Sequence, residues 1–219
     1  MIKKKHEEVQ SDLREHNQKL QDMTSQEMLL WGYEKFDNEF AITTSFGIQS
    51  SVLLKMVSES CLQKKIKIFW IDTGYLPAET YQYAEKLIND LSLEIEVLQS
   101  DLSPARMESL YGKLWETGER KDLDKYHQIR KVEPLEKALS NLQVKCWASG
   151  VRSSQTENRN NMRFLDVIRD RMSLRPLLNW TNKDIFYYMK ENKLPDHPLF
   201  LKGYSTVGDW HSSSPDGAD

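Results

Sequence analysis

The stretch Ile66-Lys67-Ile68-Phe69-Trp70-Ile71, followed by Asp72-Thr73-Gly74, decides the fold of this sequence. Its near-continuous apolar run is typical of a strand that is buried on both faces. Shorter β-prone runs lie at 40–44, 93–98 and 144–148, and helical patterns occur at 51–57, 79–91 and 131–142. Strands and helices that alternate at this spacing are joined by right-handed crossovers. We therefore expect an α/β fold with a mostly parallel, twisted sheet and helices on both faces.

The composition excludes several classes of protein. The chain has 219 residues, of which 39% are hydrophobic and 29% charged, and its net charge is −3. No apolar run reaches the length of a membrane span, and the charged start does not fit a secretory signal peptide. A slightly acidic chain is not expected to bind nucleic acid through a basic face. These features predict a cytoplasmic protein that binds neither nucleic acid nor a membrane.

The chain is expected to contain one main domain. Residues 1–22 are polar and predict an N-terminal arm or helix, residues 23–211 form the domain, and residues 212–219 form an irregular tail. Thr24 with Glu27 has the pattern of a capping box at the start of a helix. Thr181, with Asp184 in the following turn, marks another helix start.

The segment from Ser45 to Ser51 lies between a predicted strand and a predicted helix. A glycine lets the backbone approach a ligand, and a helix N-terminus offers unpaired amides to an anion. The segment lacks the Gly-Lys-Ser/Thr ending of a Walker A loop. It is either an anion-binding loop or an ordinary turn with a serine cap. Its candidate ligand-binding residues are Ser45, Phe46, Gly47, Ser50 and Ser51.

A second candidate loop follows the long apolar strand. Ligands of open α/β sheets bind beyond the carboxyl ends of strands, which is where Asp72, Thr73 and Gly74 are expected. An acidic residue there suits hydrogen bonding to a ribose or a base edge. The alternative is that the segment only starts the next helix, since Pro77 and Glu79 suit a helix N-terminus.

Cations suited to phosphate or sulfate follow in two further segments. Lys131 lies at the start of Lys131-Val132-Glu133-Pro134-Leu135, and Gly150, Arg152 and Arg159 come after a predicted strand. A guanidinium binds such anions in a bidentate fork, and an ammonium supplies a point charge. The alternative for the arginines is a solvated basic face. His197 and His211 are expected to be structural, because two histidines without suitably spaced cysteines or carboxylates make no convincing metal site.

Taken in order, these segments resemble the phosphoadenylylsulfate (PAPS) reductases, of the adenine-nucleotide α-hydrolase-like superfamily with a modified P-loop. The resemblance extends from about residue 20 to residue 211. The motifs that carry it are Ser45-Phe46-Gly47 with Ser50, Trp70-Ile71-Asp72-Thr73-Gly74-Tyr75, Lys131-Val132-Glu133-Pro134-Leu135, Gly150-Val151-Arg152-Ser153-Ser154-Gln155, and His197-Pro198-Leu199 with Gly203-Tyr204. The resemblance implies that residues 23–211 bind the nucleotide.

Cysteine usage separates the branches of this family. Reductases that carry an iron–sulfur cluster and act on adenylylsulfate (APS) have cysteine pairs at places that correspond here to Tyr126-His127 and to Asp209 with Ser212. The resemblance therefore implies the cluster-free branch, with PAPS as the substrate and no metal. Related ATP pyrophosphatases carry an aspartate where this chain has Gln49, which also favours the reductases.

The resemblance further implies a reaction in two steps. A cysteine thiolate near the C-terminus attacks the sulfo sulfur and releases adenosine 3′,5′-bisphosphate, and thioredoxin or glutaredoxin then reduces the S-sulfocysteine to release sulfite. Neither Cys61 nor Cys146 occupies the nucleophile's place, so no catalytic residue is expected in this chain, and the nucleophile is expected beyond Asp219. We expect a truncated chain that binds nucleotide without turnover. A homodimer is also implied.

Three alternatives remain open at this stage. The chain could be a non-catalytic module that binds PAPS or its bisphosphate product. It could be an ATP pyrophosphatase or adenylyl-transferring enzyme on the same fold, although Gln49 disfavours this. It could also use APS without a cluster.

Overall fold

The structure is a computed structural model that describes residues 2–217 apart from 61, 63, 156–158 and 160. The chain divides into two compact units. The first unit consists of residues 1–42, 52–66 and 144–193. The second consists of residues 43–51, 67–143 and 194–219.

The strands have the order β3-β2-β1-β4-β6-β5 in a six-stranded sheet. β2 (Lys67–Ile71) pairs in parallel with β3 (Ile95–Leu98), and β4 (Cys146–Ser149) pairs in parallel with β6 (Arg171–Leu174). The edge strand β5 (Leu165–Ile168) is antiparallel to β6. The mostly parallel α/β sheet expected from the sequence is thus confirmed. β1 (Phe40–Thr44) has the predicted bounds, whereas β3 and β4 begin two residues later than predicted.

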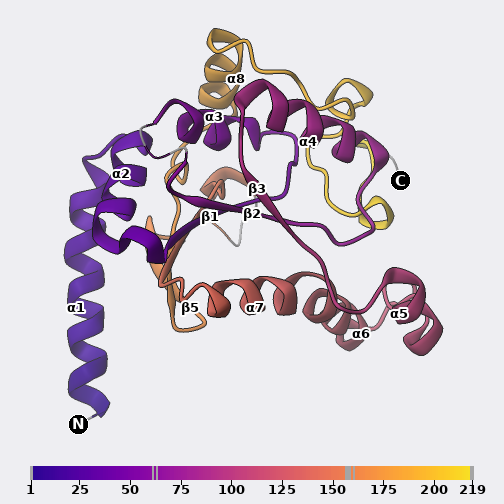
Figure 1. The fold of residues 1–219 in the computed structure, drawn as a ribbon, viewed down its shortest axis with the longest axis horizontal. Coiled ribbons are helices and arrows are strands. Elements are labelled where there is room, and N and C mark those ends of the chain that lie inside the picture. The colour runs from indigo at the N-terminus through magenta and orange to yellow at the C-terminus, as the bar shows by residue number, and fades with distance from the viewer. Residues whose placement is uncertain (1, 61, 63, 156–158, 160, 218–219) are drawn as a thin grey trace. The chain divides into compact units, whose positions relative to one another are not determined.

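The helices of the first unit begin where the sequence indicates. α2 (Ser25–Phe36) and α8 (Asn182–Glu191) each start with a complete capping box, formed by Thr24 with Glu27 and by Thr181 with Asp184. α3 (Ser51–Glu59) matches the apolar helix predicted from residue 51. The polar N-terminal segment forms the long helix α1 (Ile2–Gln21), which is seen at the N-terminal end of the chain in Figure 1. Its Leu13 and Leu20 are buried.

A β-hairpin occupies the basic stretch that follows Gly150, where the sequence predicts no strand. Its strands are β5 and β6, joined at Arg169 and Asp170. Both joining residues have positive φ, 49° and 61°, as a tight hairpin turn with a right-handed strand twist requires. The usual Asn-Gly or Asp-Gly signal for such a turn is missing, which explains why the sequence does not reveal it.

The second unit places helices on opposite sides of β2 and β3. In Figure 1, α4 (Ala78–Leu91) lies on one side of these strands and α7 (Glu133–Asn141) on the other. This arrangement agrees with the helix-covered sheet expected from the sequence. α4 has nearly the predicted bounds, while the predicted helix at 131–142 is the last part of a longer helical run.

The longer run contains elements that the sequence analysis missed. α5 (Pro104–Tyr111) and α6 (Arg120–His127) precede a π-helical turn, η2 (Gln128–Val132), which leads into α7. The last segment of the chain is mostly irregular, as expected, with short 3₁₀ turns η5 (Phe200–Lys202) and η6 (Trp210–Ser212). Short 3₁₀ turns in the first unit are η1 (Asp37–Glu39) and η3 (Ser153–Gln155). Among the residues described, no helix is long and apolar enough to cross a membrane.

Candidate functional site

The loop after β2 is organised by the carboxylate of Asp72. This carboxylate accepts hydrogen bonds from the Gly74 amide (2.8 Å), the Tyr81 hydroxyl (2.6 Å) and the Gln99 side-chain amide (2.6 Å). Asp72 and Thr73 are buried. These three hydrogen bonds fix the position of the Asp72 carboxylate. The carboxylate in turn fixes the conformation of the loop at the carboxyl end of β2.

The loop between β1 and α3 holds a buried phenylalanine in an unusual backbone conformation. Phe46 has a φ of 48°, in the left-handed region that a bulky side chain rarely adopts. The Phe46 amide donates to the Thr44 hydroxyl (3.2 Å), and its ring packs edge-on against Trp70, with ring centroids 4.9 Å apart. These contacts hold the loop in place despite the backbone strain.

The other candidate residues of this loop differ in how far their side chains or backbone are exposed to solvent. Ser45 is exposed, Gly47 and Ser50 are half-buried, and Ser51 is buried. The Ser50 hydroxyl donates to the Gly47 carbonyl (2.8 Å). A Cβ added at Gly47 would lie 3.4 Å from the Val207 carbonyl oxygen, so the glycine lets the C-terminal segment pass close to the loop.

The π-helical turn η2 supplies a buried cation to the Asp72–Gly74 loop. The guanidinium of Arg130 donates to the carbonyl oxygens of Thr73 and Leu102, with a distance of 2.6 Å from Nε to the Thr73 oxygen. Arg130 is 2% exposed. The sequence analysis did not select Arg130. π-helical turns occur often at functional sites, but a single sequence gives little sign of one.

The next residue, Lys131, reaches a carboxylate of the C-terminal segment. Its Nζ lies 2.7 Å from Oδ2 of Asp209, whose side chain is 1% exposed, whereas the Lys131 side chain is 37% exposed. The Thr73 hydroxyl donates to the other oxygen of Asp209. The structure therefore brings the predicted residues Thr73 and Lys131 to the same carboxylate.

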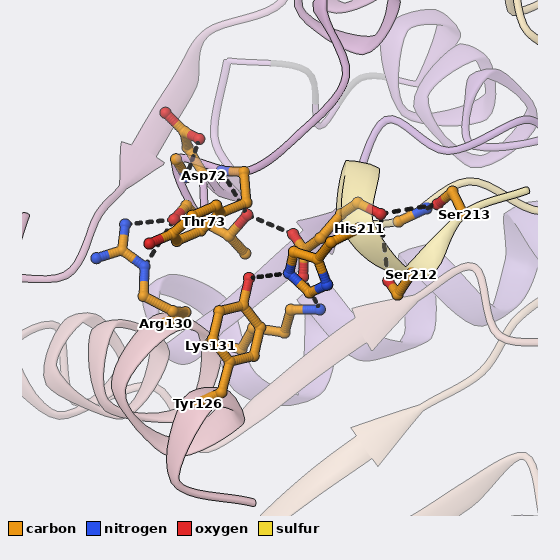
Figure 2. Close-up of polar contacts among 12 residues, drawn as sticks. Asp72, Thr73, Tyr126, Arg130, Lys131, His211, Ser212 and Ser213 are labelled. Atoms are coloured by element: carbon orange, nitrogen blue, oxygen red, sulfur yellow. Dashed lines mark hydrogen bonds and ion pairs between the residues drawn. The ribbon is translucent and has the colours of Figure 1, made fainter. Parts of the chain in front are cut away.

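Two aromatic side chains complete the surroundings of this carboxylate. In Figure 2 the side chains of Thr73, Tyr126, Lys131 and His211 point toward one another. The Tyr126 hydroxyl lies 3.1 Å from Nε2 of His211, and the imidazole stacks on Trp115 at 4.2 Å. Burial and the neighbouring Asp209 raise the pKa of Tyr126, while burial lowers the pKa of His211. Both side chains are therefore neutral near pH 7.

The electrostatics of the cluster keep Asp209 ionised. Burial alone would raise the pKa of its carboxyl group, but the charge of Lys131 and the hydrogen bonds from Lys131, Thr73 and Tyr126 lower it below the ordinary value. The result is an ion pair between a buried carboxylate and a partly exposed ammonium, beside a loop at the carboxyl end of a parallel strand. In open α/β sheets this is where ligands bind.

The remaining predicted residues belong to the first unit. The Arg152 guanidinium donates to the Trp180 carbonyl (3.1 Å), Oδ1 of Asn182 (2.9 Å) and the Ser154 hydroxyl (3.3 Å). Arg159 donates to the Gln155 side-chain oxygen, which also accepts from the Arg152 amide (3.2 Å). Gly150 directly follows β4 and is exposed. Burial, and to a lesser extent the charge of Arg159, lower the pKa of Arg152.

His197 has the structural role that the sequence suggests. Its side chain is buried, with Nδ1 accepting from the Leu199 amide (3.1 Å) and Nε2 lying 3.1 Å from the Thr80 hydroxyl. Cys146 is buried, and burial raises the pKa of its thiol; Cys61 lies outside the described residues. No three His, Cys, Asp or Glu side chains gather to hold a metal ion within the described part of the chain.

Comparisons with known proteins agree on one family. The family model of the phosphoadenosine phosphosulfate reductase domain matches residues 39–215. A phosphoadenosine 5′-phosphosulfate reductase of Synechococcus sp. is 46% identical over 207 residues, which cover 94% of this chain and 88% of that protein. A protein of the same description from Vibrio cholerae is 41% identical over 207 residues, with coverages of 94% and 81%.

Solved structures agree with the sequence comparisons. A phosphoadenylyl-sulfate reductase from Candida auris, solved as a phosphate complex, superposes with a TM-score of 0.80 at 27% identity, over 94% of this chain and 97% of that one. An FMN adenylyltransferase from Candida glabrata has a TM-score of 0.61 at 16% identity, over 92% of this chain and 66% of that one. At that identity the second likeness concerns the fold alone.

Proposed function

Because this chain belongs to the phosphoadenosine phosphosulfate reductase family, we propose that its substrate is PAPS, which the complete reaction converts to sulfite and adenosine 3′,5′-bisphosphate. The reductant is a dithiol protein such as thioredoxin or glutaredoxin. Its two thiols supply both electrons, so the reaction balances without an iron–sulfur cluster or a metal. The observation that carries the proposal is the Lys131 ammonium beside the Asp72–Gly74 loop, inside the segment that the family model matches.

Lys131 suits the charge that develops in this reaction. When a thiolate attacks the sulfo sulfur, the bond from sulfur to the phosphate oxygen breaks and its electron pair stays on the phosphate. A cation near that oxygen stabilises the transition state more than the bound substrate. Lys131 combines a fixed position on Asp209 with a side chain that is 37% exposed. We assign it to the anionic oxygens of the leaving group.

The two loops of the second unit supply the other proposed contacts with the ligand. Ser45, Phe46, Gly47, Ser50 and Ser51 precede or open α3, where backbone amides and hydroxyls suit a phosphate or sulfate. Asp72, Thr73 and Gly74 form the second loop, for which we propose contacts with the nucleoside. For Gly150, Arg152 and Arg159 of the first unit, a role in binding the substrate stays a prediction from the sequence.

Neither cysteine of this sequence is proposed as the nucleophile. Cys146 lies in β4, fully buried, and its raised pKa keeps it a thiol, whereas the attacking species must be a thiolate. Cys61 lies outside the described residues. We therefore propose that these 219 residues bind the nucleotide and do not by themselves turn PAPS over.

A cytoplasmic homodimer is the proposed working form.

Calorimetric titration with adenosine 3′,5′-bisphosphate tests the site. The Lys131→Ala variant is expected to bind about tenfold to a hundredfold more weakly than the wild type, the range for losing a hydrogen bond to a charged group. Lys137→Ala is the matched control, because Lys137 is an exposed lysine of the same unit that pairs with Asp101 at 2.7 Å. Supplied with PAPS and reduced thioredoxin, the wild-type chain is expected to release no sulfite.

Two results would count against the proposal. If Lys131→Ala binds adenosine 3′,5′-bisphosphate as tightly as the wild type, Lys131 is not part of the binding site. Equal affinity for adenosine 5′-monophosphate and for the 3′,5′-bisphosphate would favour APS over PAPS as the substrate, since the 3′-phosphate distinguishes the two. Sulfite release by this chain would overturn the assignment of both cysteines as non-catalytic.

A further inference from the structure

The carboxylate of Asp209 is the most enclosed charge of the C-terminal segment. It directly precedes the 3₁₀ turn η6, and its side chain is 1% exposed. Oδ1 accepts from the Thr73 hydroxyl, and Oδ2 lies 2.7 Å from the Lys131 ammonium. Asp209 therefore links the loop after β2 to the π-helical turn η2, two elements that carry proposed ligand-binding residues.

The backbone next to Asp209 adds to this link. The Trp210 amide donates to the Tyr75 carbonyl at 2.7 Å, which ties the residue after Asp209 to the same loop. The Ser212 and Ser213 hydroxyls both donate to the Asp209 carbonyl, at 3.2 and 3.0 Å. Figure 2 shows these serines beside the cluster. Asp209 is thus held by backbone contacts that do not depend on its carboxylate.

Charged and titratable groups near Asp209 come from several elements, including Tyr75 of the loop after β2 and Tyr81 of α4. Lys131 and Arg130 belong to η2, Tyr126 and His127 to the end of α6, and His211 to η6. Burial lowers the pKa of His127 and of His211, so neither histidine competes with Lys131 as a cation near pH 7. The ammonium of Lys131 is the cation that the structure pairs with this carboxylate.

We propose that Asp209 is a positioning residue for Lys131: it holds the ammonium beside the Asp72–Gly74 loop before the anionic substrate arrives. This inference rests on the proposed function, because it assumes that Lys131 contacts the ligand. An ammonium has three donors. The ion pair with Asp209 fixes the ammonium and leaves donors for oxygens of the ligand.

The physical advantage is preorganisation. A free lysine has four flexible bonds along its stem, and a ligand must restrict them when it binds. Asp209 imposes that restriction while the protein folds. The negative charge of Asp209 opposes an incoming anion, but it is buried and is neutralised by the same lysine that it orients. We therefore expect the orienting effect to exceed the repulsion.

Asp209→Asn is the sharpest substitution, because it keeps the size of the side chain and an acceptor for Thr73. It replaces the oxygen that faces Lys131 with an amide, which offers no acceptor. We expect adenosine 3′,5′-bisphosphate to bind up to about tenfold more weakly, the range for losing one immobilised flexible side chain. Asp101→Asn is the matched control, because the exposed pair of Asp101 and Lys137 also has a 2.7 Å contact and should not affect binding.

A double-mutant cycle with Lys131→Ala separates positioning from a general structural effect. If Asp209 acts through Lys131, then Asp209→Asn causes no further loss of affinity once Lys131 is alanine, and it raises the affinity to the extent that the Asp209 charge, no longer neutralised by Lys131, repels the anion. A loss of equal size in both backgrounds would overturn the inference, as would wild-type affinity of Asp209→Asn. If Lys131→Ala itself binds like the wild type, the proposed function and this inference both fail. If it binds weakly while Asp209→Asn does not, the inference alone fails.

Folding is checked first by urea unfolding of each variant. If Asp209→Asn does not fold, Asp209→Ser replaces it, since this change also removes the carboxylate that pairs with Lys131 and leaves the proposed ligand-binding residue Thr73 unchanged. The same cycle then applies. A loss of affinity that vanishes in the Lys131→Ala background supports positioning, and a loss that persists, or no loss at all, overturns it.

Discussion

At the scale of single residues, Gly74 shows why the loop after β2 admits no side chain at that position. Its φ is 74°, a conformation that favours glycine. A Cβ there would lie 2.7 Å from Cγ of Pro104 and 2.9 Å from Nη2 of Arg130. Arg130 already donates to the Thr73 carbonyl, so a shift of its guanidinium would disturb the loop that presents Thr73 to Asp209.

Gly74→Ala is expected to lower the free energy of unfolding by about 2–4 kcal/mol, which combines backbone strain with overpacking. Gly203→Ala is the control, because Gly203 also has a positive φ, 86°, in the left-handed region, but the nearest atom to an added Cβ is Cβ of Pro215 at 3.9 Å. It should lose only about 1 kcal/mol from the backbone conformation. Urea unfolding of both variants measures the difference. Equal losses would show that the contacts with Pro104 and Arg130 relax freely.

At the scale of elements, the helix α1 protects the edge strand β5. The side chain of Asn17, which is buried, donates to the Leu165 carbonyl at 2.8 Å and accepts from the Leu165 amide at 3.0 Å. One amide side chain thus satisfies both backbone groups of a strand residue, as a neighbouring strand would. An unprotected edge strand is a site for pairing with another chain, so this contact also limits aggregation.

Asn17→Ala is expected to lower the free energy of unfolding by about 2–3 kcal/mol, because it leaves the buried amide and carbonyl of Leu165 without these partners. It should also speed hydrogen exchange at the Leu165 amide. Asn192→Ala serves for comparison, since Asn192 donates to the Tyr188 carbonyl of its own helix α8. If Asn17→Ala unfolds at the urea concentration of Asn192→Ala, the strand does not depend on the helix.

At the scale of the whole molecule, the sequence predicts those parts that depend on near neighbours. The capping box at Thr24 and the helix start at Thr181 were predicted because all their atoms lie within one helical turn. The apolar strand β2 and the helix α4 were predicted from their patterns. In contrast, α6 is a short, highly charged helix, and its buried Tyr126 packs against Tyr75 and Trp115 from distant segments. The sequence of such an element contains no hydrophobic pattern that predicts a helix.

The residues of the candidate site likewise divide into those that the sequence predicts and those that it does not. Thr73 was selected because it follows a predicted strand. Lys131 was selected because it supplies a point charge in a segment that resembles a family motif. Asp209 was noted only as a place where cluster-bearing relatives carry a cysteine, and Arg130 was not selected. Their importance comes from burial and from partners far along the chain, which a single sequence does not reveal.

The stability of the whole fold should fall in mild acid, with His197 as one contributor. Burial lowers the pKa of His197 below its ordinary value of 6.5, against a smaller opposing effect of Glu79. The unfolded chain therefore binds the proton more readily, so stability is full above pH 6.5 and is lost as the pH falls toward the lowered pKa. The slope from this group is at most about 1.4 kcal/mol per pH unit.

His197→Asn provides the comparison, because its side-chain oxygen can still accept from the Leu199 amide but does not titrate. Urea unfolding between about pH 5 and pH 7 should show a shallower pH dependence for this variant than for the wild type. Identical slopes would mean that the acid sensitivity comes from other groups, such as His16, His127 or His211, whose pKa values burial also lowers.

The π-helical turn between α6 and α7 has a consequence for how this region can vary in length. The Glu133 amide donates to the Gln128 carbonyl, five residues back, so the turn contains one residue more than regular α-helical winding would use. Deleting that residue would leave an uninterrupted helix with both flanking faces intact. It would also rotate Arg130 or Lys131, the two adjacent cations of η2, by about 100° about the helix axis, away from the group that the side chain now contacts. A single-residue gap here, which an alignment would score as minor, would therefore separate the lysine from its carboxylate without changing either residue.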